Sequence, residues 1–306
     1  RPPRSTPLYS SAASDVYKRQ LEYVPFIILL LALFTISGGV RLTGALVGTP
    51  IVNVAIILIG TFLASWMGTT GAAMLLIRPL INANKHRKNI VHIIVFFIFL
   101  VANIGGSLTP LGDPPLFLGF LKGVEFFWTT TAMFVPMLIM IIALSIIFYF
   151  LDSYYLKKED IKVETPQEKL KLGIEGVFNL GLIVGVIGAV LISGFWKPHI
   201  SFEVYSGVHL ELQNLTRDIL LLLLTYTSWT YTPQQIRKDN EYTWFPIIEV
   251  AKLFAGIFVT IIPAIAILKA GTNGALSGII NAVSSDNGPV NIMYFWYTGV
   301  LSSFLD

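Results

Sequence analysis

IGGSLTPLGDPP, residues 104–115, interrupts an otherwise apolar run that extends from residue 89 to residue 125. Its three glycines and three prolines cannot continue a helix, although proline suits the first position of a helix that starts again. We therefore expect two helical arms joined by unwound backbone that offers carbonyl, hydroxyl and carboxylate oxygens. The candidate binding residues in this stretch are Gly106, Ser107, Thr109, Gly112 and Asp113.

The composition identifies the broad class of the protein. Of 306 residues, 54% are hydrophobic and only 13% are charged, and the mean hydropathy is +0.71. Soluble domains carry about 25% charged residues. This excludes a disordered chain, a coiled coil, a nucleic-acid binder and an ordinary soluble enzyme. The absence of cysteine excludes disulfides, thiolate metal sites and cysteine nucleophiles. We predict an all-α polytopic protein whose main partner is the lipid bilayer.

Several apolar segments are long enough to cross a membrane, which takes about 20 residues. They are residues 21–39, 127–151, 173–194, 214–232 and 244–269. Three further segments, 50–82, 89–125 and 289–306, are broken or cut off. Broken segments must line a cavity or lie buried in protein, because lipid cannot satisfy their free backbone groups. We therefore expect function at the breaks.

The loops carrying Lys and Arg fall on one side if residues 50–82 form a re-entrant hairpin, and that side is cytoplasmic by the positive-inside rule. Short matches link residues 27–34 with 247–254, 44–48 with 274–278, and 63–67 with 301–305. Such inverted repeats with paired broken helices are typical of secondary transporters. The expected domains are a first repeat at 21–151, a cytoplasmic linker at 152–172, and a second repeat at 173–306 that is truncated in its hairpin. Residues 1–20 are expected to be a non-native or disordered leader, with a lipid-binding basic arm as the alternative.

SWMGTTG, residues 65–71, forms the expected tip of the first hairpin. The free N–H groups of the second arm could bind an anion there, whereas carbonyl and hydroxyl oxygens could bind a cation. A glycine-permitted kink, with the hydroxyls bonded back to the helix, is the alternative. The candidate residues at this tip are Ser65, Gly68, Thr69 and Thr70.

Two acidic positions inside apolar segments need an explanation. Asp113 is the only acid from residue 89 to residue 124, and an acid at membrane depth suggests function. The alternative for Asp113 is a helix-capping carboxylate. Glu249 and Lys252 lie three residues apart on one helix face, where they form either a buried neutral pair or a proton relay.

The stretch IGGSLTPLGDPPLFLGF resembles the GG-x-x-TP-x-G-x-PP loop of the ion-transporter superfamily, and ASWMGTTGAAMLLIRPLI resembles its first hairpin. This superfamily includes arsenite permeases, divalent-anion symporters, citrate transporters and D-type sodium/proton antiporters. The resemblance covers about residues 21–306 and is greatest to bacterial chains called sodium/proton antiporter or citrate transporter. It implies an alternating-access carrier with two re-entrant hairpins and two unwound helices, in the bacterial inner membrane, and a homodimer. It also implies a first ion site formed by Ser65, Gly68, Thr69, Thr70, Gly106, Thr109, Gly112 and Asp113.

The first functional interpretation is sodium/proton antiport. Asp113 stands where anion-carrying relatives tend to have a neutral residue, and sodium and protons would compete for its carboxylate. We place the sodium ion at Thr69, Thr70, Thr109 and Asp113, and we expect no cofactor beyond the transported Na⁺ and H⁺. The alternative is sodium- or proton-coupled symport of citrate or a dicarboxylate. The hairpin tip reads Gly68-Thr69-Thr70, whereas that of the symporters reads Ser-Asn-Thr. A membrane enzyme is disfavoured because no HExxH, paired-aspartate or metal-spacing motif is present.

Overall fold

The computed structural model describes residues 8–44, 46–159, 173–205, 208–285 and 288–305. The chain forms two compact units, one of residues 20–251 and one of residues 1–19 with 252–306. Among the described residues the structure is mostly helical, and three two-stranded ribbons join some of the helices. The prediction of a mostly helical protein is therefore confirmed.

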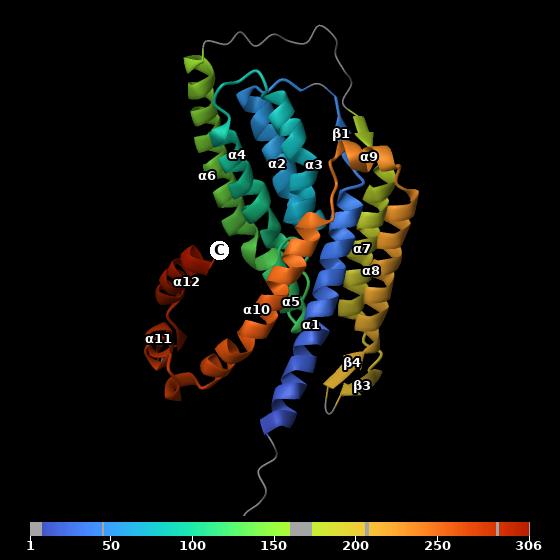
Figure 1. The fold of residues 1–306 in the computed structure, drawn as a ribbon. Helices are drawn as coiled ribbons and strands as arrows, with labels where there is room; N and C mark the ends of the chain where they lie inside the picture. The colour runs from blue at the N-terminus through green and yellow to red at the C-terminus, as the bar shows by residue number, and fades with distance from the viewer. Residues whose placement is uncertain (1–7, 45, 160–172, 206–207, 286–287, 306) are drawn as a thin grey trace, which may run out of the picture. The chain divides into compact units, whose positions relative to one another are not determined.

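The first half of the larger unit is drawn from blue to light green in Figure 1. Its elements are α1 (Leu8–Ser37), β1 (Arg41–Thr43), α2 (Pro50–Met67), α3 (Thr69–Ala83), α4 (Val91–Phe97), the π-helix η1 (Ile98–Asn103), the 3-10 helix η2 (Ile104–Leu108), α5 (Pro114–Leu121) and α6 (Trp128–Lys158). Residues 8–20, expected to be a non-native or disordered leader, continue α1 as helix, and residues 1–7 lie outside the described residues.

The later elements are β2 (Gly173–Glu175), α7 (Val177–Phe195), β3 (Ser201–Tyr205), β4 (Val208–Glu211), α8 (Leu212–Tyr231), α9 (Gln234–Asp239), α10 (Phe245–Lys269), the 3-10 helix η3 (Gly271–Asn273), α11 (Ser277–Val283), β5 (Ser284–Ser285), β6 (Gly288–Pro289) and α12 (Asn291–Leu305). β1 pairs with β2, β3 with β4 and β5 with β6, each antiparallel. Within the larger unit α7 packs along α8, as Figure 1 also shows.

Helices α2 and α3 run back alongside each other, with a single residue between them. Thr49 caps α2 by accepting a hydrogen bond from the Val52 N–H at 3.3 Å, and Pro50 occupies its first turn. Gly68 ends α2 with φ of 80°, a conformation that glycine adopts without strain, and α3 begins at the next residue. At the other end the Gly48 N–H donates to the Ala83 carbonyl at 2.8 Å. The re-entrant placement of the α2–α3 pair in a bilayer remains a prediction.

The segment from residue 91 to residue 121 is broken as expected. α4 continues directly as the π-helix η1, which is followed by η2. η2 ends at Leu108, and the chain is non-helical from Thr109 to Asp113. Pro114 is the first residue of α5, where its missing N–H costs no helical hydrogen bond. The unwound segment therefore lies between two arms, and π-helical turns such as η1 are often found near functional sites.

Six of the described helices are long and apolar enough to cross a membrane: residues 20–37, 50–67, 91–108, 128–158, 177–195 and 245–263. The helix expected at 214–232 is present as α8 but is not among the six by composition, and it carries the buried pair Arg217 and Asp218. α6 continues to Lys158, so the predicted linker at 152–172 begins inside this helix, and residues 160–172 lie outside the described residues. The inverted repeat also remains a prediction.

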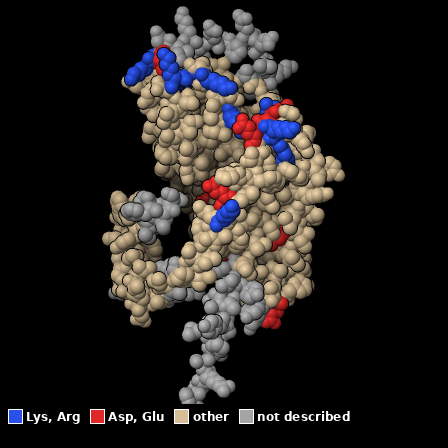
Figure 2. Space-filling view, viewed as in Figure 1, with Lys and Arg blue, Asp and Glu red and all other residues tan. Residues whose placement is uncertain are grey.

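Charged side chains gather at one end of the larger unit. Arg41 of β1 forms ion pairs with Glu175 of β2 and Asp239 of α9. Arg78 of α3 pairs with Glu241 just beyond α9. In Figure 2 blue and red atoms lie over the end of α6 and around α9, whereas the side of α6 facing the viewer is tan. The basic loops at residues 41, 85–88 and 237–238 are thus on the same end, as the loop-charge pattern predicts.

Candidate substrate and ion site

The tip of the α2–α3 pair meets the unwound segment. Ser65 Oγ donates a hydrogen bond to the Gly105 carbonyl at 2.5 Å, and Thr109 Oγ1 donates to the Ser65 carbonyl. The Thr69 N–H donates to the Gly112 carbonyl at 3.2 Å. The structure therefore brings together residues from both predicted halves of the site, which are about 40 positions apart in the chain.

Glycines permit the two segments to approach so closely. A Cβ atom on Gly112 would lie 2.7 Å from the Gly106 Cα, and one on Gly106 would lie 2.9 Å from the Thr69 methyl group. Atoms at these distances overlap, so side chains at either position would force the backbones apart. Gly106 and Gly112 therefore act by allowing close contact, and their carbonyl groups remain near the tip.

The predicted site residues divide into a buried and an accessible set. Ser65 and Thr109 are fully buried, and their hydroxyl protons are donated to carbonyl groups. Thr109 Oγ1 also accepts from the Leu111 N–H at 3.2 Å, which leaves it one further lone pair. Thr69 and Asp113 are half-buried, and Thr70 is exposed. Ser107 is also half-buried, but its hydroxyl donates to the Ile104 carbonyl of its own turn at 2.8 Å. A ligand would therefore reach Thr69, Thr70 and Asp113 first.

Asp113 occupies the position before the first turn of α5. Its backbone is extended, with φ of −140° and ψ of 136°, and its carbonyl accepts from the Leu116 N–H at 3.1 Å. Its carboxylate makes no capping hydrogen bond to α5. The helix-capping interpretation of this acid is therefore wrong.

The start of α6 holds the broken segment in place, which sequence reasoning did not identify. Thr129 Oγ1 and Thr130 Oγ1 donate to the Leu108 carbonyl at 2.9 and 2.6 Å. These bonds satisfy a carbonyl that the end of η2 leaves without a helical partner. The run of three threonines at residues 129–131 was the only signal in the sequence.

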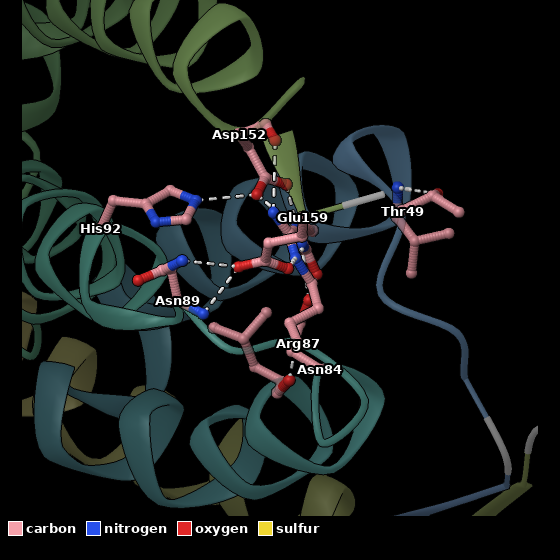
Figure 3. A network of polar contacts seen from close by, with 10 residues as sticks. Thr49, Asn84, Arg87, Asn89, His92, Asp152 and Glu159 are labelled. Carbon is pink, nitrogen blue, oxygen red and sulfur yellow. Dashed lines mark hydrogen bonds and ion pairs between the residues drawn. The ribbon is translucent and has the colours of Figure 1, made fainter. Parts of the chain in front are cut away.

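A cluster of polar side chains joins the ends of α2 and α3 that lie away from the tip (Figure 3). The Asp152 carboxylate of α6 accepts hydrogen bonds from Arg87 at 2.5 Å and from Asn53 of α2 at 2.9 Å, and it lies 2.8 Å from His92 Nε2. Asn53 and Asn84 also bond each other through their amides, at 3.0 and 2.7 Å. The side chains of Arg87 and Asp152 are completely buried. Sequence reasoning missed this cluster because it placed Asp152 in a linker.

Glu159, just beyond α6, continues the cluster toward the surface. Its carboxylate accepts from the backbone N–H and the side-chain amide of Asn89, at 2.7 and 2.9 Å, and lies 3.6 Å from Arg87 Nε. Burial alone would raise the pKa of this carboxyl, but the bonds from Asn89 and the charge of Arg87 outweigh it and lower the pKa below its usual value. The structure thus favours the ionised form of Glu159.

Glu249 and Lys252 both lie on α10. Their interpretation as a buried neutral pair or as a proton relay remains a prediction.

Comparison with known proteins now adds the family. A family model described as "Putative citrate transport" matches residues 6–306 of the chain. No curated protein and no solved structure matches it. The family is part of the ion-transporter superfamily that the 104–120 motif resembles, so this prediction is confirmed. The chain therefore belongs to this citrate transport family, and it is a multi-pass membrane transporter and not an enzyme.

Proposed function

We propose that the protein moves citrate or a related carboxylate across the membrane by alternating access, coupled to Na⁺ or H⁺. The observation that carries this proposal is the contact between the α2–α3 tip and the unwound segment at Thr109–Asp113. Broken helices that meet inside a membrane protein provide both anion and cation ligands from backbone groups. The family match supports citrate as the substrate class in preference to antiport.

The first turn of α3 supplies donors for a carboxylate. A helix leaves its first N–H groups without intrahelical partners, and the positive end of its dipole lies there. The Thr69 N–H is bonded to Gly112 and the Ala72 N–H to Gly68. The N–H groups of Thr70 and Gly71 remain the donors suited to a carboxylate, and exposed Thr70 gives access to them.

Asp113 explains why transport would require a cation. A carboxylate substrate at the tip would be repelled by the nearby Asp113 carboxylate in a medium of low dielectric constant. A cation bound among Asp113, Thr69 and Thr109 would turn this repulsion into attraction. Binding of the anion would then depend on prior binding of the cation, which is the property that couples their movement.

A specific observation also supports sodium/proton antiport as a second candidate. Asp113 is a half-buried acid at the break of a candidate membrane-spanning segment, and its carboxylate could exchange Na⁺ and H⁺ directly. Antiport needs no anion, so the two candidates differ in their response to citrate.

Uptake measurements distinguish the candidates. We expect cells or proteoliposomes containing the protein to accumulate labelled citrate when an inward Na⁺ or proton gradient is imposed. We expect no uptake when K⁺ replaces Na⁺ and the pH is equal on both sides of the membrane. Dequenching of a pH-gradient dye in everted vesicles by Na⁺ alone, with no citrate uptake under any gradient, would refute symport and establish antiport.

The resemblance to the ion-transporter superfamily also supports a proposal about assembly and location. We propose a homodimer in the bacterial inner membrane. Cross-linking of the detergent-solubilised protein, followed by mass measurement, tests the dimer; a purely monomeric mass would contradict it.

A further inference from the structure

Ser37, the last residue of α1, carries a buried hydroxyl that the fold leaves unsatisfied. Its side chain is 0% exposed, and Oγ has no hydrogen-bond partner among the residues that the structure describes. Other buried helical hydroxyls donate to a carbonyl of their own helix: Thr61 to Ile57 at 2.8 Å, Ser193 to Val190 at 2.8 Å and Thr225 to Leu221 at 2.7 Å. A buried polar atom without a partner is a place where a water molecule or an ion is expected.

The hydroxyl points at the tip of the α2–α3 pair. A Cβ atom on Gly71, in the first turn of α3, would lie 2.8 Å from the Ser37 Cβ and even closer to its Oγ. The same position is 3.7 Å from the end of the Met67 side chain, at the end of α2. Gly71 therefore allows α1 to approach the tip from a side that the unwound segment does not cover.

We propose that Ser37 Oγ is a ligand of the coupling Na⁺, so that α1 is a third element of the ion site beside the tip and the unwound segment. The inference rests on the proposed function and adds a residue outside the predicted set. A bulky carboxylate cannot reach Ser37, because the side chain is fully buried.

The surrounding chemistry suits a small cation. α2 ends at Met67, so the carbonyl groups of its last turn and the negative end of its dipole lie at this point. Arg237 donates to the Thr35 carbonyl at 2.9 Å and so satisfies this carbonyl at the end of α1. The attraction for a cation therefore comes from the oxygen atoms of the tip and of Ser37. Hydroxyl and carbonyl oxygens are the ligands that hard cations prefer.

The test compares Ser37→Ala with Ser193→Ala, whose hydroxyl is already bonded within its own helix. We expect Ser37→Ala to raise the Na⁺ concentration for half-maximal citrate uptake several-fold, while the KM for citrate at saturating Na⁺ stays unchanged. It should also reduce the rise in melting temperature that Na⁺ produces relative to choline in the purified protein. Ser193→Ala should leave both Na⁺ responses as in the wild type.

A second variant guards against misfolding of the first. Ser37→Cys is nearly the same size but offers sulfur, a poor ligand for a hard cation, so it should reproduce the loss of Na⁺ response. If the wild type responds to Na⁺ and either well-folded variant responds equally, the inference about Ser37 is wrong and the proposed function stands. If the wild type takes up citrate with protons alone and gains no stability from Na⁺, the sodium coupling itself is wrong.

Discussion

At the scale of single residues, the decisive group is Asp113. It combines a carboxylate, partial burial and a position at the break of a helix, and it makes no capping bond. Its proposed task is electrostatic, because it makes anion binding conditional on a cation.

We predict that Asp113→Asn abolishes cation-coupled transport, because the amide keeps the shape but not the charge that attracts the cation. Labelled citrate uptake under an inward Na⁺ or proton gradient is the measurement, with surface-normalised protein amounts. Asn103→Ala on the same broken segment, an exposed residue, is the control and should transport normally. Full cation-coupled uptake by Asp113→Asn would remove this residue from the coupling site.

The Asp152 cluster permits a prediction about stability. Asp152→Asn removes the closer of the two carboxylates that face the buried Arg87 guanidinium and leaves only Glu159, and breaking a buried ion pair costs up to about 3–5 kcal/mol. Arg41→Gln removes partly exposed ion pairs, for which about 0–1 kcal/mol is expected. The melting temperatures of the two variants and the wild type are compared in one detergent. Equal shifts for both variants would show that burial of the Arg87–Asp152 pair adds nothing to the stability of the protein.

At the scale of elements, the site depends on contact between two backbones. We predict that Gly112→Ala lowers uptake about a hundredfold, which is the cost of a misplacement of about 1 Å in a preorganised site. The added methyl group would overlap Gly106, whereas a Cβ on Gly119 of α5 meets its nearest neighbouring atom at 3.8 Å. Gly119→Ala is therefore the matched control. Normal uptake by well-expressed Gly112→Ala would show that the contact is not needed for transport.

Glu159 links the 84–90 loop to the end of α6 and gives a pH dependence. Its pKa is lowered in the folded protein, so its contribution to stability is present above the unfolded pKa, near 4.5, and is lost as the pH falls through the lower folded value. We predict that Glu159→Gln is less stable than the wild type at neutral pH and that the difference disappears in acid. Melting curves of both proteins from pH 7 downward measure this difference in stability. A difference that grows as the pH falls would contradict the lowered pKa of Glu159.

The elements also show what the sequence alone can predict. The break at residues 104–115 was predictable because glycine and proline act locally on the backbone. The bonds from Ser65 to Gly105 and from Thr109 to Ser65 were not, since they join residues that only tertiary packing brings together. The end of α6 was placed too early because its last turns are polar, although Asp152 there is held by the buried side chains of Asn53 and Arg87.

At the scale of the whole molecule, the distribution of charge predicts the orientation in the membrane. Basic side chains on β1, the 84–90 loop and α9 share one end of the larger unit, and such an excess of Lys and Arg marks the cytoplasmic side. The β3–β4 ribbon follows α7, a candidate span whose other end joins β2, so it should lie on the opposite side.

The complete absence of cysteine makes this orientation directly testable, because a single introduced thiol is the only one in the chain. We predict that Lys85→Cys and Lys238→Cys react with a membrane-impermeant maleimide only in everted vesicles. Glu203→Cys, on β3, should react only in right-side-out vesicles. Thr70→Cys discriminates the re-entrant placement of the α2–α3 pair: a tip held inside the membrane is shielded by citrate and the coupling cation, whereas a tip that crosses fully reacts from the outside regardless of ligand. Labelling of Lys85→Cys and Lys238→Cys from different sides would refute the assigned topology, because it would require an additional crossing between them.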